Sequence, residues 1–189
     1  MRVLMGVVVL GVAALLCYGL QASKPRPVDL ARTVPVAGRQ GETVRGRFLA
    51  GRVDKVEFAR NLKVPFDREA RTLTTDGLWV VVTLELEAMR QPVVLYRRTW
   101  NGPSGLTFHE SDRAPAGLPT GFMVGQASRG RLVFEIRPEA ASGASLHLSR
   151  DWISRFDSEL RIDLDAIPRD PAGGPDVVDT LDLSLGGDA

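Results

Sequence analysis

The 189-residue chain is poor in several residue types on which common functions depend. It contains one cysteine, Cys17, so an intramolecular disulfide cannot form. Its two histidines, His109 and His147, are the side chains that could transfer a proton near neutral pH. Aromatic residues make up 6% of the chain, and no basic cluster with interleaved aromatic residues occurs. Because the formal net charge is also only +1, the composition argues against nucleic-acid binding.

Catalytic motifs are equally scarce. The pattern G-x-S-x-G, which places a nucleophilic serine on a strained turn, is absent. Ser104 lies in NGPSGL, a turn of Asn, Gly and Pro in which serine is ordinary. No nucleophile, base and orienting group can be assigned together. We therefore expect a protein that is not an enzyme and that uses no cofactor.

Two acidic segments have the composition of metal sites but lack the required spacing. In FHESD, residues 108–112, an extended backbone turns His109 and Glu110 to opposite faces, so shared ligation needs a bend. The segment DLDAIPRD, residues 163–170, lacks the ligand spacing and central glycine of an EF-hand loop. The sequence predicts no metal site, with FHESD as the alternative.

A long uncharged run, VLMGVVVLGVAALLCYGLQA, occupies residues 3–22. A helix of twenty residues spans about 30 Å, which matches the hydrocarbon core of a bilayer. We interpret it as an uncleaved signal-anchor helix through the lipid bilayer. A cleaved secretory signal is the alternative, although Leu20 does not provide the small residue that a cleavage site prefers. Leu16 before Cys17 likewise argues against lipidation.

The charges that flank this run favour one orientation. Arg2 lies before it, and Lys24, Arg26 and Arg32 follow it. Counted alone, they place the C-terminal side in the cytoplasm.

The rest of the chain is long enough for one domain. Residues 23–42 combine proline, glycine and basic residues without periodicity, which predicts an extended linker. Residues 43–165 carry the strand patterns and form the predicted sandwich. Residues 166–189 form an acidic tail with proline and glycine, which is either a last edge strand or disordered.

Strand periodicity dominates residues 43–165. In DGLWVVVTLELEA, residues 76–88, apolar side chains recur at every second position from Leu78 to Leu86. Similar alternation marks RGRLVFEIRP, ASLHLS and SELRIDLD. Seven to nine short strands without a long amphipathic helix between them predict an all-β fold, an antiparallel β-sandwich.

A binding surface can be proposed from the aromatic and basic residues. Exposed tryptophan can stack on sugars or anchor a protein contact, whereas a buried tryptophan packs the core. Trp100 ends a strand, Trp152 lies in a short turn, and Arg97 and Arg98 precede Trp100. We predict these four residues as the binding surface, with core packing as the alternative for the two tryptophans.

Five segments together resemble a known group of proteins: GETVRGRFL, DGLWVVVTLEL, LTFHESDR, the glycine before RLVFEI, and GASLHLS. Over residues 41–164 the sequence is similar to bacterial extracytoplasmic domains of unknown function that have the immunoglobulin-like sandwich of the mycobacterial immunoprotective secreted antigen. The resemblance implies an immunoglobulin-like fold and a domain outside the cytoplasmic membrane, against the charge count. It implies no catalytic residues.

From these observations we expect a non-catalytic protein-interaction or accessory module of the bacterial cell envelope. Its location would be the cell membrane, with the C-terminal domain outside, or secretion if the N-terminal segment is cleaved. Its partner would be an envelope or membrane protein. The alternative is an envelope glycan-binding or metal-ion-binding module, which would use Trp100 and Trp152 or FHESD.

Overall fold

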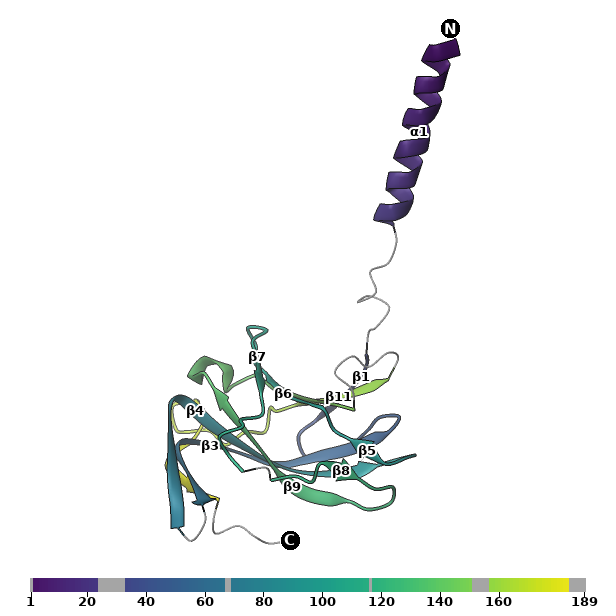
Figure 1. Ribbon diagram of the computed structural model, residues 1–189. Coiled ribbons are helices and arrows are strands. Elements are labelled where there is room, and N and C mark those ends of the chain that lie inside the picture. The colour runs from purple at the N-terminus through teal and green to yellow at the C-terminus, as the bar shows by residue number, and fades with distance from the viewer. Residues whose placement is uncertain (1, 24–32, 67–68, 116, 151–156, 184–189) are drawn as a thin grey trace. The chain divides into compact units, whose positions relative to one another are not determined.

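The computed structural model describes residues 2–23, 33–66, 69–115, 117–150 and 157–183 (Figure 1). The chain divides into two units, Met1–Arg32 and Thr33–Ala189, and each is described by itself.

The first unit contains one helix, α1 (Arg2–Ala22). Its last turn is closed by the Ser23 hydroxyl, which donates to the Leu20 carbonyl at 3.1 Å, and by the Ser23 N–H, which donates to Gly19 at 3.0 Å. Within the described residues, no helix combines the length and apolar character that crossing a membrane requires. The structure has an N-terminal helix over these residues and does not support the predicted bilayer span over residues 3–22.

The second unit is a β-sandwich of two sheets, which confirms the predicted all-β architecture (Figure 1). Sheet A has the order β1-β11-β10-β6-β7, made of β1 (Val34–Arg39), β11 (Ser158–Asp163), β10 (Ser145–Ser149), β6 (Arg97–Asn101) and β7 (Thr107–His109). Sheet B has the order β12-β3-β4-β9, made of β12 (Val177–Asp182), β3 (Leu49–Phe66), β4 (Glu69–Ala88) and β9 (Ser128–Ile136), with β2 (Val44–Arg45) paired to β3. Smaller elements are the β5 (Val93–Val94) and β8 (Gly121–Phe122) pair and a 3-10 turn, η2 (Pro138–Ala140).

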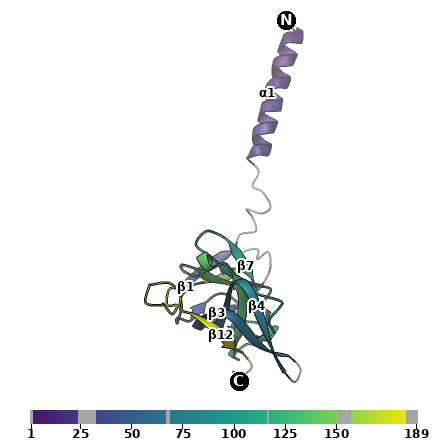
Figure 2. The same cartoon turned by 90° about the vertical axis from the view of Figure 1, so that its left-hand side faces the viewer.

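The sequence predicted antiparallel sheets, but both sheets also contain a parallel pair of strands. The first and last strands of the sandwich, β1 and β12, pair in parallel with β11 and β3. In Figure 2 β12 lies beside β3 at the margin of sheet B. Parallel pairing is possible here because each of these strands is joined to its partner by a long stretch of chain and not by a hairpin.

The presence of β1 shortens the linker that the sequence predicts over residues 23–42. The strand falls within this range, and it pairs with β11 along its whole length, from Val34 opposite Ser158 to Arg39 opposite Asp163. The sequence of β1 lacks the alternation of apolar and polar residues that identifies a strand. An edge strand that buries little surface does not need this alternation. In the tail, the structure forms the edge strand β12 and does not leave residues 177–182 irregular.

The core lies between the sheets and centres on Trp100. Its ring packs against Phe58 at 6.1 Å in a T-shaped arrangement and against Phe134 at 6.2 Å. The inward residues of β4 from Leu78 to Leu86 join this core. A second, smaller apolar cluster on the outer face of sheet B buries Trp79. The strand β4 is covered on both faces there, which explains why its sequence is a continuous apolar run.

Candidate functional site

The three predicted binding residues that the structure describes, Arg97, Arg98 and Trp100, do not meet in one surface. Arg97 and Arg98 are neighbours on β6, so their side chains point to opposite faces of sheet A. Arg97 lies opposite Ser149 on the outer face, where Nη1 reaches Glu159. Arg98 Nη1 instead donates to Glu110 Oε2 at 2.7 Å.

The predicted role of Trp100 is wrong. Its side chain is fully buried, and its indole N–H donates to the Ala140 carbonyl at 2.9 Å. A strand-terminal tryptophan is drawn into the core because its large apolar area outweighs the one polar atom, which finds a partner. Trp152 lies outside the described residues.

The outer face of sheet A is polar across three strands, because Trp100, Leu146 and Ile162 take the inward positions. Residues that face each other across strands come into register, so polar side chains from distant segments become neighbours. In order across β6, β10 and β11, the outward positions are Arg97 and Ser149, then Thr99, His147 and Arg161, then Asn101, Ser145 and Asp163.

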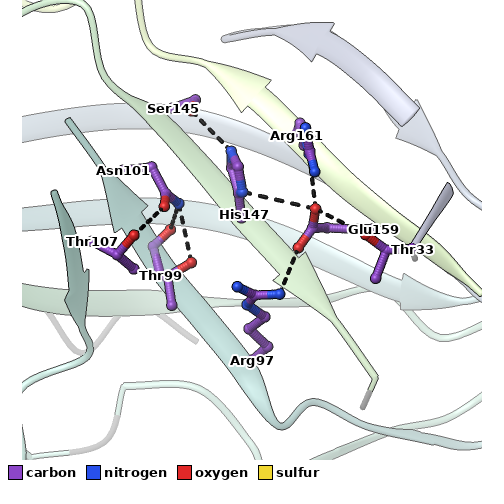
Figure 3. Close-up of polar contacts among 9 residues, drawn as sticks. All are labelled: Thr33, Arg97, Thr99, Asn101, Thr107, Ser145, His147, Glu159 and Arg161. Carbon is purple, nitrogen blue, oxygen red and sulfur yellow. Dashed lines mark hydrogen bonds and ion pairs between the residues drawn. The ribbon is translucent and has the colours of Figure 1, made fainter. Parts of the chain in front are cut away.

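A buried carboxylate, Glu159, organises this face (Figure 3). Glu159 is 1% exposed. Arg161 Nε donates to its Oε2 at 2.8 Å, and the Thr33 hydroxyl donates to the same oxygen at 3.4 Å. His147 Nδ1 lies 3.8 Å from Oε2, and Arg97 Nη1 lies 3.2 Å from Oε1. The carboxylate thus joins β6, β10, β11 and the residue that precedes β1.

Burying a carboxylate is costly unless it is paired and hydrogen-bonded. Glu159 Oε2 is hydrogen-bonded by Arg161 of the same strand, and Oε1 is ion-paired with Arg97 of β6 without a hydrogen bond. The side chains of these arginines remain 34% exposed for Arg97 and 42% for Arg161. The negative charge is therefore beneath the surface, and the positive charges are at the surface.

His147 occupies the centre of the same face. Its Nε2 lies 3.0 Å from the Ser145 Oγ, and its side chain is 16% exposed. Burial lowers the pKa of His147, the charge of Glu159 raises it in part, and Arg161 and Arg97 lower it further. The side chain is thus held neutral near pH 7.

The side chains of Ser145, His147 and Glu159 lie next to one another in the order of the nucleophile, the base and the orienting carboxylate of a catalytic triad. Two features differ from those of a catalytic triad. The 3.8 Å between His147 Nδ1 and Glu159 is too long for the hydrogen bond that orients such a base. Ser145 begins a regular strand that is paired on both sides, with Asn101 and with Asp163, and does not lie on the strained turn that presents a nucleophilic serine.

A hydroxyl and amide network continues the face toward β7 (Figure 3). The Thr107 hydroxyl donates to Asn101 Oδ1 at 2.7 Å, and Asn101 Nδ2 donates to the Thr99 hydroxyl at 3.1 Å. These bonds fix the orientation of the amide.

Further arginines gather around the start of β11. Arg150 Nε lies 3.4 Å from Asp157 Oδ2, and Asp157 is buried, at 4% exposure. The Arg47 N–H donates to the Ser158 hydroxyl at 2.7 Å. The guanidinium carbons of Arg47 and Arg150 lie 5.0 and 4.6 Å from the Phe48 ring centre, within cation–π range.

The FHESD segment does not form a metal site in the structure. Glu110 pairs with Arg98, and burial raises the pKa of Glu110, against the effect of Arg98. Among the described residues, no three His, Cys, Asp or Glu side chains are grouped to hold a metal ion.

A pocket of about 260 Å³ lies between the end of the β3–β4 hairpin and residues 112–115. Val64 and Leu73 line it, with Arg113 at its rim. Arg113 donates to Glu135 Oε2 at 3.0 Å and lies 5.1 Å from the centre of the Trp79 ring. The Arg113 guanidinium group therefore covers the smaller apolar cluster, which contains Trp79.

Sequence reasoning missed Glu159 and Arg161. The alternation in SELRID places both on the polar face of one strand, but the other partners of Glu159 come from β6, β10 and Thr33. A single-strand pattern cannot reveal which outward carboxylate is buried.

Comparison with known proteins bears on the fold. No protein-family model matches the chain, and no curated protein matches it. Among solved structures, the secreted protein MPT63 from Mycobacterium tuberculosis is similar, with a TM-score of 0.51 and 13% identity over 70% of this chain and 99% of that one. An uncharacterized β-sandwich protein from Clostridium difficile 630 aligns with a TM-score of 0.40 and 9% identity over 73% and 99%. The likeness to MPT63 confirms the predicted resemblance at the level of the fold.

Proposed function

We propose that this chain is an extracytoplasmic, non-catalytic domain of the bacterial cell envelope that binds a partner protein through the outer face of sheet A. The observation that carries the proposal is the Glu159 cluster. It holds Arg97, His147 and Arg161 in place while leaving both guanidinium groups partly exposed. Side chains that are ordered before binding lose less entropy on association, and arginine is enriched at protein interfaces.

Location outside the cytoplasm is supported by two features. The uncharged N-terminal segment fits an export signal. The sandwich shares its fold with a protein that is secreted.

The face of sheet A is a better contact than the β1 edge. The N–H groups of Val34 and Gln40 donate to the carbonyls of Asp157 and Asp163, so Pro35, Ala37 and Arg39 face the free edge by alternation. Pro35 has no N–H, and the Arg39 N–H donates to Glu42 Oε2 at 3.1 Å. An added strand would find few donors there.

The alternative, a glycan-binding module, has less support. The two tryptophans that the structure describes, Trp79 and Trp100, are both fully buried and offer no stacking platform for a sugar.

The test places a photo-crosslinking residue at Asp163, an exposed position on the face, in the full chain in its own cells. The control position is Arg129 on sheet B, whose side chain is 65% exposed. We expect one envelope protein to be trapped from Asp163 and not from Arg129. In parallel, a membrane-impermeant amine reagent should label intact cells at Lys55 and Lys63, whose side chains are 60% and 42% exposed.

Three results would contradict the proposal. One is equal trapping from both positions. Another is labelling that requires a permeant reagent. The third is turnover of a substrate by the purified chain that is lost in Ser145→Ala or His147→Ala.

A further inference from the structure

The sequence contains two asparagines, and Asn101 is the one that precedes a glycine; Asn61 precedes Leu62. An Asn–Gly pair is prone to deamidation, because glycine has no side chain to shield the backbone nitrogen that attacks the amide. In this reaction the Gly102 nitrogen loses its proton and bonds to Asn101 Cγ. The Cγ–Nδ2 bond breaks, and Nδ2 leaves as ammonia with the proton that Gly102 lost. Water then opens the cyclic imide to aspartate or isoaspartate.

The folded domain ties up the attacking nitrogen. Asn101 is the last residue of β6, and Gly102, directly after it, is buried. The Gly102 N–H donates to the Leu106 carbonyl at 2.9 Å, within the turn between β6 and β7. A Cβ at Gly102 would lie 2.9 Å from Ala140 Cβ, so the backbone here packs closely against η2. Loss of the Gly102 proton would break this hydrogen bond and place a charge on a buried nitrogen.

The amide that would be attacked is held at both ends (Figure 3). The Thr107 hydroxyl donates to Asn101 Oδ1 at 2.7 Å, and Asn101 Nδ2 donates to the Thr99 hydroxyl at 3.1 Å. Asn101 is also paired on both sides, with Ser145 of β10 and with Thr107 of β7. These contacts oppose the rotation that brings Asn101 Cγ onto the Gly102 nitrogen. Closure of the imide therefore requires the β6–β7 hairpin to open.

The hairpin is weakly held on the side of β7. This strand has three residues, Thr107–His109, and it is the end strand of sheet A. Residues 103–107, which connect it to Gly102, are all exposed. Opening this hairpin breaks far fewer contacts than unfolding the sandwich, so it costs less free energy and occurs more often.

We propose that Asn101 is a deamidation site whose reaction rate is set by local opening of the β6–β7 hairpin. The product lies on the outer face of sheet A, in the row that Asn101 forms with Ser145 and Asp163. Aspartate adds a negative charge to this row. Isoaspartate also adds one carbon atom to the main chain, so the pairing with β10 and β7 loses its register. The inference concerns the modification itself and does not depend on the proposed function.

The test incubates the purified full chain at mildly alkaline pH and follows deamidation by peptide mapping with mass spectrometry. Asn61 in the same molecule is the internal control. We expect conversion at Asn101 and none at Asn61 over the same period. In urea that unfolds the chain, Asn101 should react at least about 10-fold faster than in the folded chain, because the hairpin no longer protects it.

Thr107→Val removes the donor to Asn101 Oδ1 and keeps a β-branched side chain at an exposed strand position. The loss of one hydrogen bond should raise the rate at Asn101 by about 3-fold to 10-fold. Thr107→Ser keeps the hydroxyl and should react as the unmodified chain does. Ser104→Ala is the matched control, because Ser104 is exposed in the same hairpin and no hydrogen bond joins it to Asn101 within the described residues; its rate should be unchanged.

A last variant separates local opening from global unfolding. In Gly130→Ala the added Cβ would lie 2.9 Å from Leu118 Cγ, on sheet B and away from the hairpin, so the domain is destabilised while the Asn101 contacts remain. We expect its rate at Asn101 to be unchanged. Circular dichroism of each variant shows whether the fold is retained.

Four outcomes overturn the inference. They are no conversion of Asn101 in the folded chain, equal rates in folded and urea-unfolded chain, equal rates in Thr107→Val and Thr107→Ser, or an acceleration in Gly130→Ala that matches the acceleration in Thr107→Val.

Discussion

Arg97 Nη1 lies 3.2 Å from Glu159 Oε1, although the two residues belong to strands that are not neighbours. Arg97 is on β6, Glu159 is on β11, and β10 runs between them. The pair therefore reaches across an intervening strand. This contact ties three strands of sheet A together on the side that faces away from the core.

Glu159→Gln should destabilise the domain. The substitution keeps the side-chain shape but removes the charge that two guanidinium groups and His147 surround. Because the arginines are partly solvated, we expect a loss of about 1–3 kcal/mol in the free energy of unfolding. Urea denaturation measures it. Glu57→Gln is the control, since its pair with Lys55 is exposed and should be worth less than about 1 kcal/mol. Equal effects of the two substitutions would contradict the assigned role of Glu159.

The stability of the domain should fall as pH drops below the ordinary pKa of histidine, about 6.5. Burial lowers the pKa of His147 in the folded state, so the unfolded chain binds the proton more readily. Stability that is present above this pH is lost as the pH falls toward the folded pKa. His147→Gln should remove this part of the pH dependence. Glu110, whose pKa is raised, titrates with the opposite sign and cancels in the difference between the two proteins.

The measurement is the free energy of unfolding at several pH values between 5 and 8, for the unmodified chain and for His147→Gln. A difference between them that does not vary with pH would show that the protonation of His147 is not linked to folding.

Trp100→Phe should cost more than Trp79→Phe. Both side chains are fully buried, but Trp100 donates a hydrogen bond to Ala140, whereas Trp79 Nε1 has no hydrogen-bond partner among the described residues. Removing the Trp100 donor also leaves a buried carbonyl unpaired. We expect Trp100→Phe to exceed Trp79→Phe by about 1–3 kcal/mol in denaturant unfolding. A larger cost for Trp79→Phe would be inconsistent with this assignment.

Gly130→Ala should destabilise the contact between β9 and the segment that crosses its edge. A Cβ at Gly130 would lie 2.9 Å from Leu118 Cγ and closer still to the Gly117 carbonyl oxygen. Overpacking of this kind costs about 1–3 kcal/mol. Gly121→Ala is the matched strand control, because its nearest atom is 3.9 Å away, and it should stay within about 0.5 kcal/mol. Thermal unfolding distinguishes the two, and an unchanged melting temperature for Gly130→Ala would contradict the close packing.

The β class of the domain and the inward faces of its clearest strands follow from the amino-acid pattern alone. Leu78 to Leu86 on β4 and Leu160 and Ile162 on β11 are buried as the alternation predicts, because a period of two is local and one apolar face must be covered. The strand β1 escaped detection because it buries little.

The candidate site, in contrast, depends on contacts between distant segments. In the folded domain Trp100 is buried in the core, and the side chains of Arg97 and Arg98 lie on opposite sides of sheet A. Glu159 is buried among side chains from β6, β10 and β11. The physical reason is that a charged residue in a strand pattern is always predicted to face solvent. Whether it is buried depends on partners that strand pairing brings from distant parts of the chain.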